Sequence, residues 1–299
     1  MSILVLGTAA LDSVKTPHGY RRDMLGGSAV HFAMGSRLFA GVSLAAVVGE
    51  DFPDKHLRFL KASGVDLASV VVQEGKTFRW SGDYRADMNV ALTLKTELGV
   101  LSAFRPRLHS SHKAKKYVFL ANVDPDIQHE LLTHMRAPRL IGLDSMNFWI
   151  QHKKKSLLKL FKKVHVFVAN DAEARSLTGE VNLLKAARAL RKLGVAVVVI
   201  KKGEHGVFLL AQDFVIALPA YPSECVVDPT GAGDTFAGGF MGYLAREGKI
   251  NRYTLRQALL HGTIMASFNV EGFGLERSSK VAFKDIQKRL HHFRAIAGF

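Results

Sequence analysis

The feature that most constrains the fold is a regular alternation of apolar runs and helical patterns after residue 117. Apolar runs typical of buried strands lie at residues 117–121, 140–143, 164–168 and 195–200. Helical patterns near residues 126–135, 153–163 and 171–177 follow the first three runs, and a further one near 182–193 precedes the last. Strands that alternate with helices predict a parallel sheet with helices on both faces. The sequence therefore predicts an α/β protein with a central, mostly parallel sheet.

The chain has the size and composition of one globular domain. Its 299 residues can bury a large core, and 48% apolar residues exclude a disordered chain. The single cysteine, Cys225, excludes an intrachain disulfide and a cysteine-based metal cluster. The first residues lack the pattern of a signal peptide, and no apolar run is long enough to span a bilayer. We expect one domain over residues 1–299, in the cytoplasm and without a membrane partner.

The formal charge of +15 leaves two interpretations open. Basic residues cluster near 105–116 and 153–163, which fits a nucleic-acid surface. The second cluster also fits the solvated face of a helix, because Leu157, Leu158 and Phe161 lie beneath the lysines at helical spacing. Aromatic residues do not alternate with these lysines, and no nucleic-acid-binding module accompanies them. We therefore expect no nucleic-acid partner, and a positive field that favours nucleotides.

Residues 227–240 combine a glycine turn with the start of a helix. Pro229 disfavours a helix interior, and the next two glycines allow a tight turn with free backbone N–H groups. From Asp234 onward, apolar residues return at helical spacing. Such a helix N-terminus binds anions, and a carboxylate beside it can accept a proton from a hydroxyl. The segment is a candidate site for phosphoryl transfer; the alternative is that Asp234 only caps the helix.

Two common phosphate-binding motifs are absent from the sequence. The fingerprint G-x-G-x-x-G fails because Phe236 occupies its third glycine position, and no G-x-x-x-x-G-K-[ST] occurs. The string D-P-T-G-A-G-D-T-F-A-G-G-F at residues 228–240 instead resembles the C-terminal signature of ribokinase-like (PfkB-type) carbohydrate kinases. The resemblance implies an ATP-dependent phosphotransferase in which Asp234 is the catalytic base. It also implies an anion hole formed by the amides of Gly231, Ala232 and Gly233.

The same resemblance implies a ribokinase-like fold, which is a three-layer α/β/α sandwich with a small β-lid over the substrate. Residues 12–25 and 70–100 are expected to form the lid, and the second range has short strand-like runs. In the family the lid often forms a dimer interface, so we expect a homodimer. Arg79, Trp80 and Tyr84 are candidates to line the substrate pocket. The alternative is that the aromatic side chains only cover one face of a small sheet.

Two N-terminal segments resemble the acceptor-binding part of the family. Asp12 follows the first strand, at an edge of a parallel sheet where ligands bind, although alone it suggests a turn residue. Gly26 and Gly27 open a helix and match the family's G-G-x-x-x-N motif, except that His31 replaces the asparagine. The resemblance implies that these four residues and Arg79 hold the acceptor. Alternatively, His31 lies in the core or on the helix surface.

Three smaller motifs follow later strands. Asn170 and Glu173 resemble the family's N-x-x-E motif, and they also fit a helix cap with its capping-box partner. Residues 201–206 resemble the nucleotide-side glycine turn, although alone they predict only a hairpin turn. Residues 269–274 resemble the loop beside adenine and a monovalent-cation site, such as one for K⁺. The implied ATP-binding residues are Asn170, Lys201, Gly203, Gly206, Asn269, Gly272 and Gly274. Glu173 is expected to hold Mg²⁺ through water.

These observations favour a kinase that uses ATP and Mg²⁺ to phosphorylate a hydroxymethyl group of a sugar. A nucleoside such as adenosine is an alternative acceptor, because His31, Trp80 and Tyr84 permit a nucleoside as well as a sugar. A binding or regulatory protein that reuses the fold without catalysis is a further alternative, since a fold alone does not decide chemistry. The intact Asp234 and its neighbouring glycines argue against a silent protein.

Overall fold

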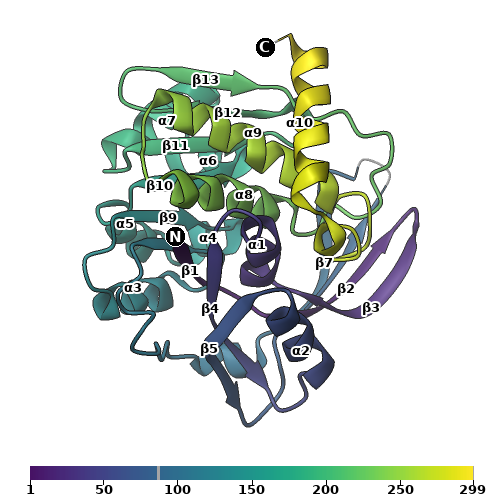
Figure 1. The fold of residues 1–299 in the computed structure, drawn as a ribbon. Helices are drawn as coiled ribbons and strands as arrows, with labels where there is room; N and C mark the ends of the chain where they lie inside the picture. The colour runs from purple at the N-terminus through teal and green to yellow at the C-terminus, as the bar shows by residue number, and fades with distance from the viewer. Residues whose placement is uncertain (86–87, 299) are drawn as a thin grey trace.

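One large sheet runs through the molecule (Figure 1). The computed structural model describes residues 1–85 and 88–298. The strands of this sheet are β1 (Ser2–Leu6), β4 (Gly41–Gly49), β5 (Val65–Gln73), β8 (Tyr117–Leu120), β9 (Leu140–Asp144), β10 (Val166–Asn170), β11 (Val197–Lys201), β12 (Val207–Leu210) and β13 (Val215–Leu218). They pair in the order β13-β12-β11-β10-β9-β8-β1-β4-β5. All pairs from β5 to β11 are parallel, and the last two pairs are antiparallel.

Helices cover both faces of the large sheet. One face carries α1 (Ser28–Ser36), α8 (Ala232–Glu247), α9 (Arg252–Asn269) and α10 (Phe283–Ala297). The other face carries α3 (Pro125–His134), α5 (Lys154–Phe161), α6 (Asp171–Thr178) and α7 (Leu183–Lys192). Alternate side chains of β1 enter opposite cores: Ile3 and Val5 pack on the first face, Leu4 and Leu6 on the second. The predicted three-layer α/β/α sandwich is confirmed.

A separate small sheet lies beside the large one. Its strands are β2 (Ala10–Thr16), β3 (Gly19–Gly26), β6 (Arg79–Tyr84) and β7 (Ala91–Glu97), in the order β3-β2-β6-β7. Residues 70–73 were expected in this sheet, but they belong to β5 of the large sheet. The reason is that Val70 packs against one core of the sandwich and Val71 against the other, so this segment extends the apolar edge of the large sheet. Residues 86–87 of the expected lid lie outside the described residues.

Two short helices complete this part of the fold. The helix α2 (Asp54–Ala62) precedes Gly64, and α4 (Asn147–His152) precedes α5 without a prediction of its own. The sequence patterns do not predict β12 and β13, because these short antiparallel strands lie outside the alternation of strands and helices. Within residues 1–85 and 88–298, no helix combines the length and apolarity that a bilayer crossing requires.

The lysine-rich segment 153–163 forms the solvated face of α5. Leu157, Leu160 and Phe161 are fully buried, whereas Lys155 and Lys159 are exposed. The apolar stripe therefore packs on the sheet and the lysines point to solvent. This arrangement agrees with the solvated-face interpretation of the charge cluster.

Candidate active site

The glycine turn leads directly into α8. Gly231 is the N-cap residue in a left-handed conformation (φ 73°, ψ 4°), and the helix begins at Ala232. Asp234 is therefore the third helical residue, and the interpretation of Asp234 as a helix N-cap is wrong. Its carboxylate lines a cavity of about 170 Å³ together with Gly233 and Lys201. The turn and the acidic side chain thus meet at one site.

The set of free amides at this helix end differs from the predicted set by one residue. The Ala232 N–H donates to the Pro229 carbonyl (3.1 Å), which closes the tight turn, so Ala232 is not a free donor. The next occupied amide is that of Thr235, which donates to the Gly231 carbonyl (2.8 Å). Within the described part of the chain, nothing accepts a hydrogen bond from the N–H groups of Gly231, Gly233 or Asp234. These three amides form the candidate anion hole.

Two fully buried side chains hold the turn from below. The Asp228 carboxylate accepts hydrogen bonds from the N–H groups of Thr230 and Gly274 (2.9 Å each). Asn269 donates from Nδ2 to the Thr230 carbonyl (2.8 Å) and accepts from the Thr235 hydroxyl (3.0 Å). Asn269 is therefore a support of the turn; its side chain is completely buried, and its contact with ATP stays a prediction.

Of the two glycines predicted beside adenine, Gly274 uses its N–H on Asp228 and Gly272 packs against Arg277. The loop at 269–274 therefore fastens the glycine turn to the end of α9. Any contact of this loop with a nucleotide stays a prediction.

His31 lies directly beneath Gly231. Its Nδ1 is 3.1 Å from the Asn269 Oδ1, and because Asn269 Nδ2 already donates to Thr230, the histidine must donate from Nδ1. Burial lowers the pKa of His31, so the ring is neutral and Nε2 is an acceptor. Among the described residues, Nε2 has no hydrogen-bond partner although it is buried. His31 is not a surface residue, and it keeps one unused acceptor.

Asp12 and the paired glycines form one unit. Asp12 lies within β2, so the interpretation as a turn residue is wrong. Its Oδ2 accepts from the Gly27 N–H (3.1 Å), and a Cβ on Gly26 would overlap the same carboxylate. Burial raises the pKa of Asp12 to about 7 against the effect of the Gly27 hydrogen bond, and the nearby charge of Asp228 adds to the shift. The backbone of both glycines therefore encloses a carboxyl group that is protonated in part near neutral pH.

Charged side chains from the ends of β9 and β11 and from α6 line the cavity. Lys201 at the end of β11 donates from Nζ to Oδ2 of Asp144 at the end of β9 (3.1 Å). Between them, Asn170 and Glu173 form the predicted capping box of α6, with two reciprocal hydrogen bonds of 2.7 Å. Sequence reasoning missed Asp144, although it follows an apolar run as Asp12 does. The position of such a carboxylate is the signal that would have found it.

The crowding of carboxylates shifts their protonation. Burial raises the pKa of Asp234 to about 8, and the charge of Asp144 adds to the shift while Lys201 opposes it. Burial and the charge of Asp144 likewise raise the pKa of Glu173 to about 7. A carboxylate whose pKa lies near neutrality is well matched to general-base catalysis.

The cavity suits a magnesium ion that is held mainly through other groups. Among the described residues, no group of three or more His, Cys, Asp or Glu side chains is close enough to bind a metal directly. Glu173 and Asp144 both line the cavity, and Mg²⁺ commonly keeps several waters and binds substrate phosphates. The side chains therefore fit the predicted contact of Glu173 through water.

The other predicted residues lie away from the cavity. Arg79 pairs with Asp51 (2.8 Å) and Asp23, which links β6 to the turn after β4 and to β3; its role as a substrate ligand stays a prediction. Gly203 and Gly206 lie in the turn between β11 and β12, and the predicted hairpin is confirmed. Neither glycine belongs to the described lining of the cavity.

The two aromatic candidates of the small sheet have different positions. Trp80 lies over Gly82 and donates to the Thr93 hydroxyl (3.2 Å), so it covers a face of the small sheet. Tyr84 is buried beside the glycine turn, where its hydroxyl is 3.4 Å from that of Thr230. Burial raises the pKa of Tyr84 to about 12, so the phenol stays protonated.

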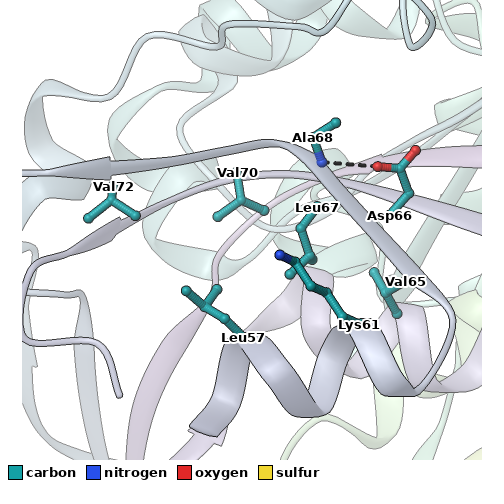
Figure 2. Close-up of a pocket in the computed structure, with 8 residues that line it drawn as sticks. All are labelled: Leu57, Lys61, Val65, Asp66, Leu67, Ala68, Val70 and Val72. Carbon is teal, nitrogen blue, oxygen red and sulfur yellow. Dashed lines mark hydrogen bonds between the residues drawn. The ribbon is translucent and has the colours of Figure 1, made fainter. Parts of the chain in front are cut away.

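A larger groove of about 550 Å³ lies elsewhere, between α2 and β5 (Figure 2). Its lining is mainly aliphatic, with Lys61 and Asp66 as the charged members. Asp66 already accepts hydrogen bonds from the Ala68 N–H (3.0 Å) and His112 (2.8 Å). Two neighbours therefore occupy the one acid of this groove, whereas three acids and a lysine line the smaller cavity beside Asp234, which is the candidate active site.

Comparison with known proteins agrees with this geometry. The model of the pfkB family carbohydrate kinases matches residues 6–281. This chain is a pfkB family kinase. A similar protein is the cytidine kinase of Thermococcus kodakarensis, which is 31% identical over 252 residues, covering 82% of this chain and 89% of the relative.

Solved structures share the fold of this kinase at lower identity. The nucleoside kinase of Methanocaldococcus jannaschii matches with a TM-score of 0.78 at 22% identity, covering 97% of this chain and 98% of that one. The ribokinase of Thermotoga maritima matches with a TM-score of 0.77 at 20% identity, covering 97% and 99%. The predicted ribokinase-like fold is confirmed.

Proposed function

We propose that this kinase transfers the γ-phosphoryl group of ATP to a hydroxymethyl group of a nucleoside. The observation that carries the proposal is the position of Asp234, whose carboxylate stands beside three free amides at the N-terminus of α8. Asp234 accepts the proton of the acceptor hydroxyl while the oxygen of that hydroxyl attacks the γ-phosphorus. The N–H groups of Gly231, Gly233 and Asp234 hold the charge on the transferred group.

The identity of the acceptor rests on the relatives and on the buried polar groups near the turn. A cytidine kinase and a nucleoside kinase are similar to this chain over most of its length. Asp12 and the unused Nε2 of His31 are the groups that we expect to hold hydroxyls of the ribose. A free sugar is the second candidate, because a ribokinase shares the same fold.

The cofactor assignment follows from the charges of the site. ATP would extend over the N-terminus of α8, and Mg²⁺ would neutralise charge on its phosphates. Glu173, which Asn170 holds in the capping box, would bind that ion through water, and Lys201 would contact a phosphate. A monovalent cation beside residues 269–274 is part of the same proposal. We also propose a cytoplasmic location, which the single cysteine supports.

The test of the acceptor class compares nucleosides with their free pentoses. We expect kcat/KM for the best of cytidine, uridine, adenosine and inosine to exceed that for ribose at least about 100-fold. The reason is that a site that hydrogen-bonds a group of its substrate strongly rejects an analogue that lacks this group. ADP release from Mg-ATP in a coupled assay gives both values. Equal or higher kcat/KM for ribose would replace the nucleoside proposal by the sugar one.

We also propose a homodimer through the small sheet. β7 is its edge strand, and Val90, Leu92 and Leu94 are 71%, 48% and 57% exposed on or beside it. An apolar edge strand of this kind is a template for pairing with a second copy. We expect Leu94→Glu to convert a dimer into a monomer in light scattering, with Val181→Glu on another exposed apolar residue as control. A monomeric wild type would refute the proposal.

A further inference from the structure

Three neighbouring strands end in polar residues that face the N-terminus of α8. Lys201 pairs in register with Asn170 across β11 and β10, and Val168 of β10 pairs with Asp144 of β9. Lys201 reaches past the middle strand to Asp144, and both side chains are largely buried, with exposures of 18% and 6%. The two charges therefore form one pair across three strands, in a cavity that also contains Asp234.

Lys201 stands next to the point of phosphoryl transfer. A Cβ on Gly233 would lie 2.8 Å from its Nζ, so the ammonium fills the space that the glycine leaves open. Of the residues that line the cavity, Lys201 is the cation and Asp144, Glu173 and Asp234 are the acids. A transferred phosphoryl group at the amides of Gly233 and Asp234 would therefore lie beside this ammonium.

Asp144 holds that ammonium rigidly. Its Oδ1 accepts from the Ser145 N–H (2.7 Å) and its Oδ2 accepts from Lys201 (3.1 Å), so both carboxylate oxygens have fixed partners. The Asp144 carbonyl is anchored as well, by Gln128 (3.3 Å). A lysine side chain has four rotatable bonds, and a fixed partner removes most of that freedom.

We propose that Asp144 is a positioning residue that aims Lys201 at the γ-phosphate, so that Lys201 stabilises the charge on the group in transfer. This inference deepens the proposed kinase function and rests on it. In the step, the bond between the acceptor oxygen and the γ-phosphorus forms and the bond from that phosphorus to the bridging oxygen of ADP breaks. The acceptor proton goes to Asp234, and Lys201 keeps its own proton throughout.

The charges around Lys201 agree with a permanently charged ammonium. Burial opposes the charged form, but the carboxylates of Asp144, Glu173 and Asp234 together raise the pKa of Lys201 above its ordinary value. Lys201 therefore acts as a fixed cation rather than as a proton donor. A fixed cation of this kind acts more strongly on a phosphate in a cavity than in water.

The first experiment measures nucleotide binding without an acceptor. Calorimetry compares ADP with a non-hydrolysable ATP analogue for wild type, Lys201→Thr and Asp144→Asn. For Lys201→Thr we expect affinity for the analogue to fall at least about tenfold while that for ADP changes less than about twofold, because ADP lacks the phosphate that Lys201 contacts. Lys192→Thr removes an exposed lysine before β11 and should change neither affinity.

The second experiment separates positioning from binding. We expect Asp144→Asn to retain affinity for the analogue within about threefold and to lose about 10²-fold in kcat, because the ammonium remains but is no longer aimed. The double variant Lys201→Thr/Asp144→Asn should bind the analogue more tightly than Lys201→Thr, since it leaves no unpaired buried carboxylate beside the phosphates. If Lys201→Thr alone does not fold, the double variant takes its place in the comparison of ADP with the analogue.

Equal losses for ADP and the analogue, or a double variant that is no better than Lys201→Thr, would overturn the inference. Unchanged kcat in Asp144→Asn would overturn it as well. Failure of every nucleoside and sugar as acceptor would instead refute the proposed function, while the binding measurements would still decide the role of Lys201.

Discussion

Replacing Asp234 by asparagine should lower kcat by about two to four orders of magnitude while the protein still binds ATP. Asparagine has nearly the same shape, but it cannot accept the proton of the acceptor hydroxyl. The amide groups of Gly231 and Gly233 and the Lys201 ammonium remain in place, so nucleotide affinity should change little. Steady-state kinetics and calorimetry measure the two effects separately. The exposed Asp213→Asn is the matched control and should keep full activity.

The same substitution should increase stability at alkaline pH. Burial raises the pKa of Asp234 from 3.8 to about 8, so between these values the folded state binds more protons than the unfolded state. The stability contributed by the protonated carboxyl is fully present below pH 4 and is lost as pH rises through 8. We expect the Tm of Asp234→Asn to exceed that of wild type by at least about 5 °C at pH 8.5 and to approach it at pH 4.

That opposite behaviour of activity and stability distinguishes a catalytic carboxylate from a structural one. A structural N-cap or ion-pair partner would lose stability on substitution and would affect activity only through unfolding. Thermal melts of wild type, Asp234→Asn and Asp213→Asn at both pH values decide between them. A lower Tm at pH 8.5 together with unchanged kcat would contradict the assigned role.

Gly231→Ala should be the most damaging single-methyl change in the site. Gly231 has φ 73°, which strains any other residue, and a Cβ there would overlap the ring of the buried His31. The ring cannot retreat easily, because Asn269 holds its Nδ1. We expect the free energy of unfolding to fall by roughly 3 kcal/mol, and kcat/KM to fall at least about 100-fold as the free amides move.

Gly179→Ala provides a closely matched control for the backbone strain. Gly179 has the same φ of 73°, but nothing lies within 4 Å of the Cβ position. Its substitution should therefore cost only about 1 kcal/mol and leave kcat/KM unchanged. Chemical denaturation and initial rates compare the two variants. If both lose the same stability and the same activity, contact between His31 and the turn does not position the anion hole.

The sequence predicts the fold well because its signals are local. Apolar runs and helical spacing are read over about ten residues, and they locate the parallel strands and the helices. The start of α8 and the capping box of Asn170 and Glu173 are equally local features. The exceptions in the large sheet are β12 and β13, which lie outside the alternation of strands and helices, and β5, whose assignment to that sheet depends on both cores that it contacts.

The candidate site is predicted only in part, because partners distant in sequence decide the role of each side chain. Asn269 and Arg79 have the chemistry of ligand-binding residues, but the fold uses them to hold Thr230, Thr235 and two carboxylates. The loss of Ala232 as a donor depends on a turn that a sequence pattern does not specify. The role of Asp144 as a partner of Lys201 depends on the fold, which places the end of β11 near the end of β9.

The most direct test identifies the acceptor of the phosphoryl group and determines whether the transfer requires Asp234. Wild type and Asp234→Asn are each incubated with Mg-ATP and an equimolar mixture of nucleosides and free pentoses. Mass spectrometry and phosphorus NMR then identify the products. We predict that wild type phosphorylates the hydroxymethyl oxygen of a nucleoside and that the variant forms at least about 100-fold less product. Phosphorylation of a free pentose alone, or equal product from the variant, would contradict the account.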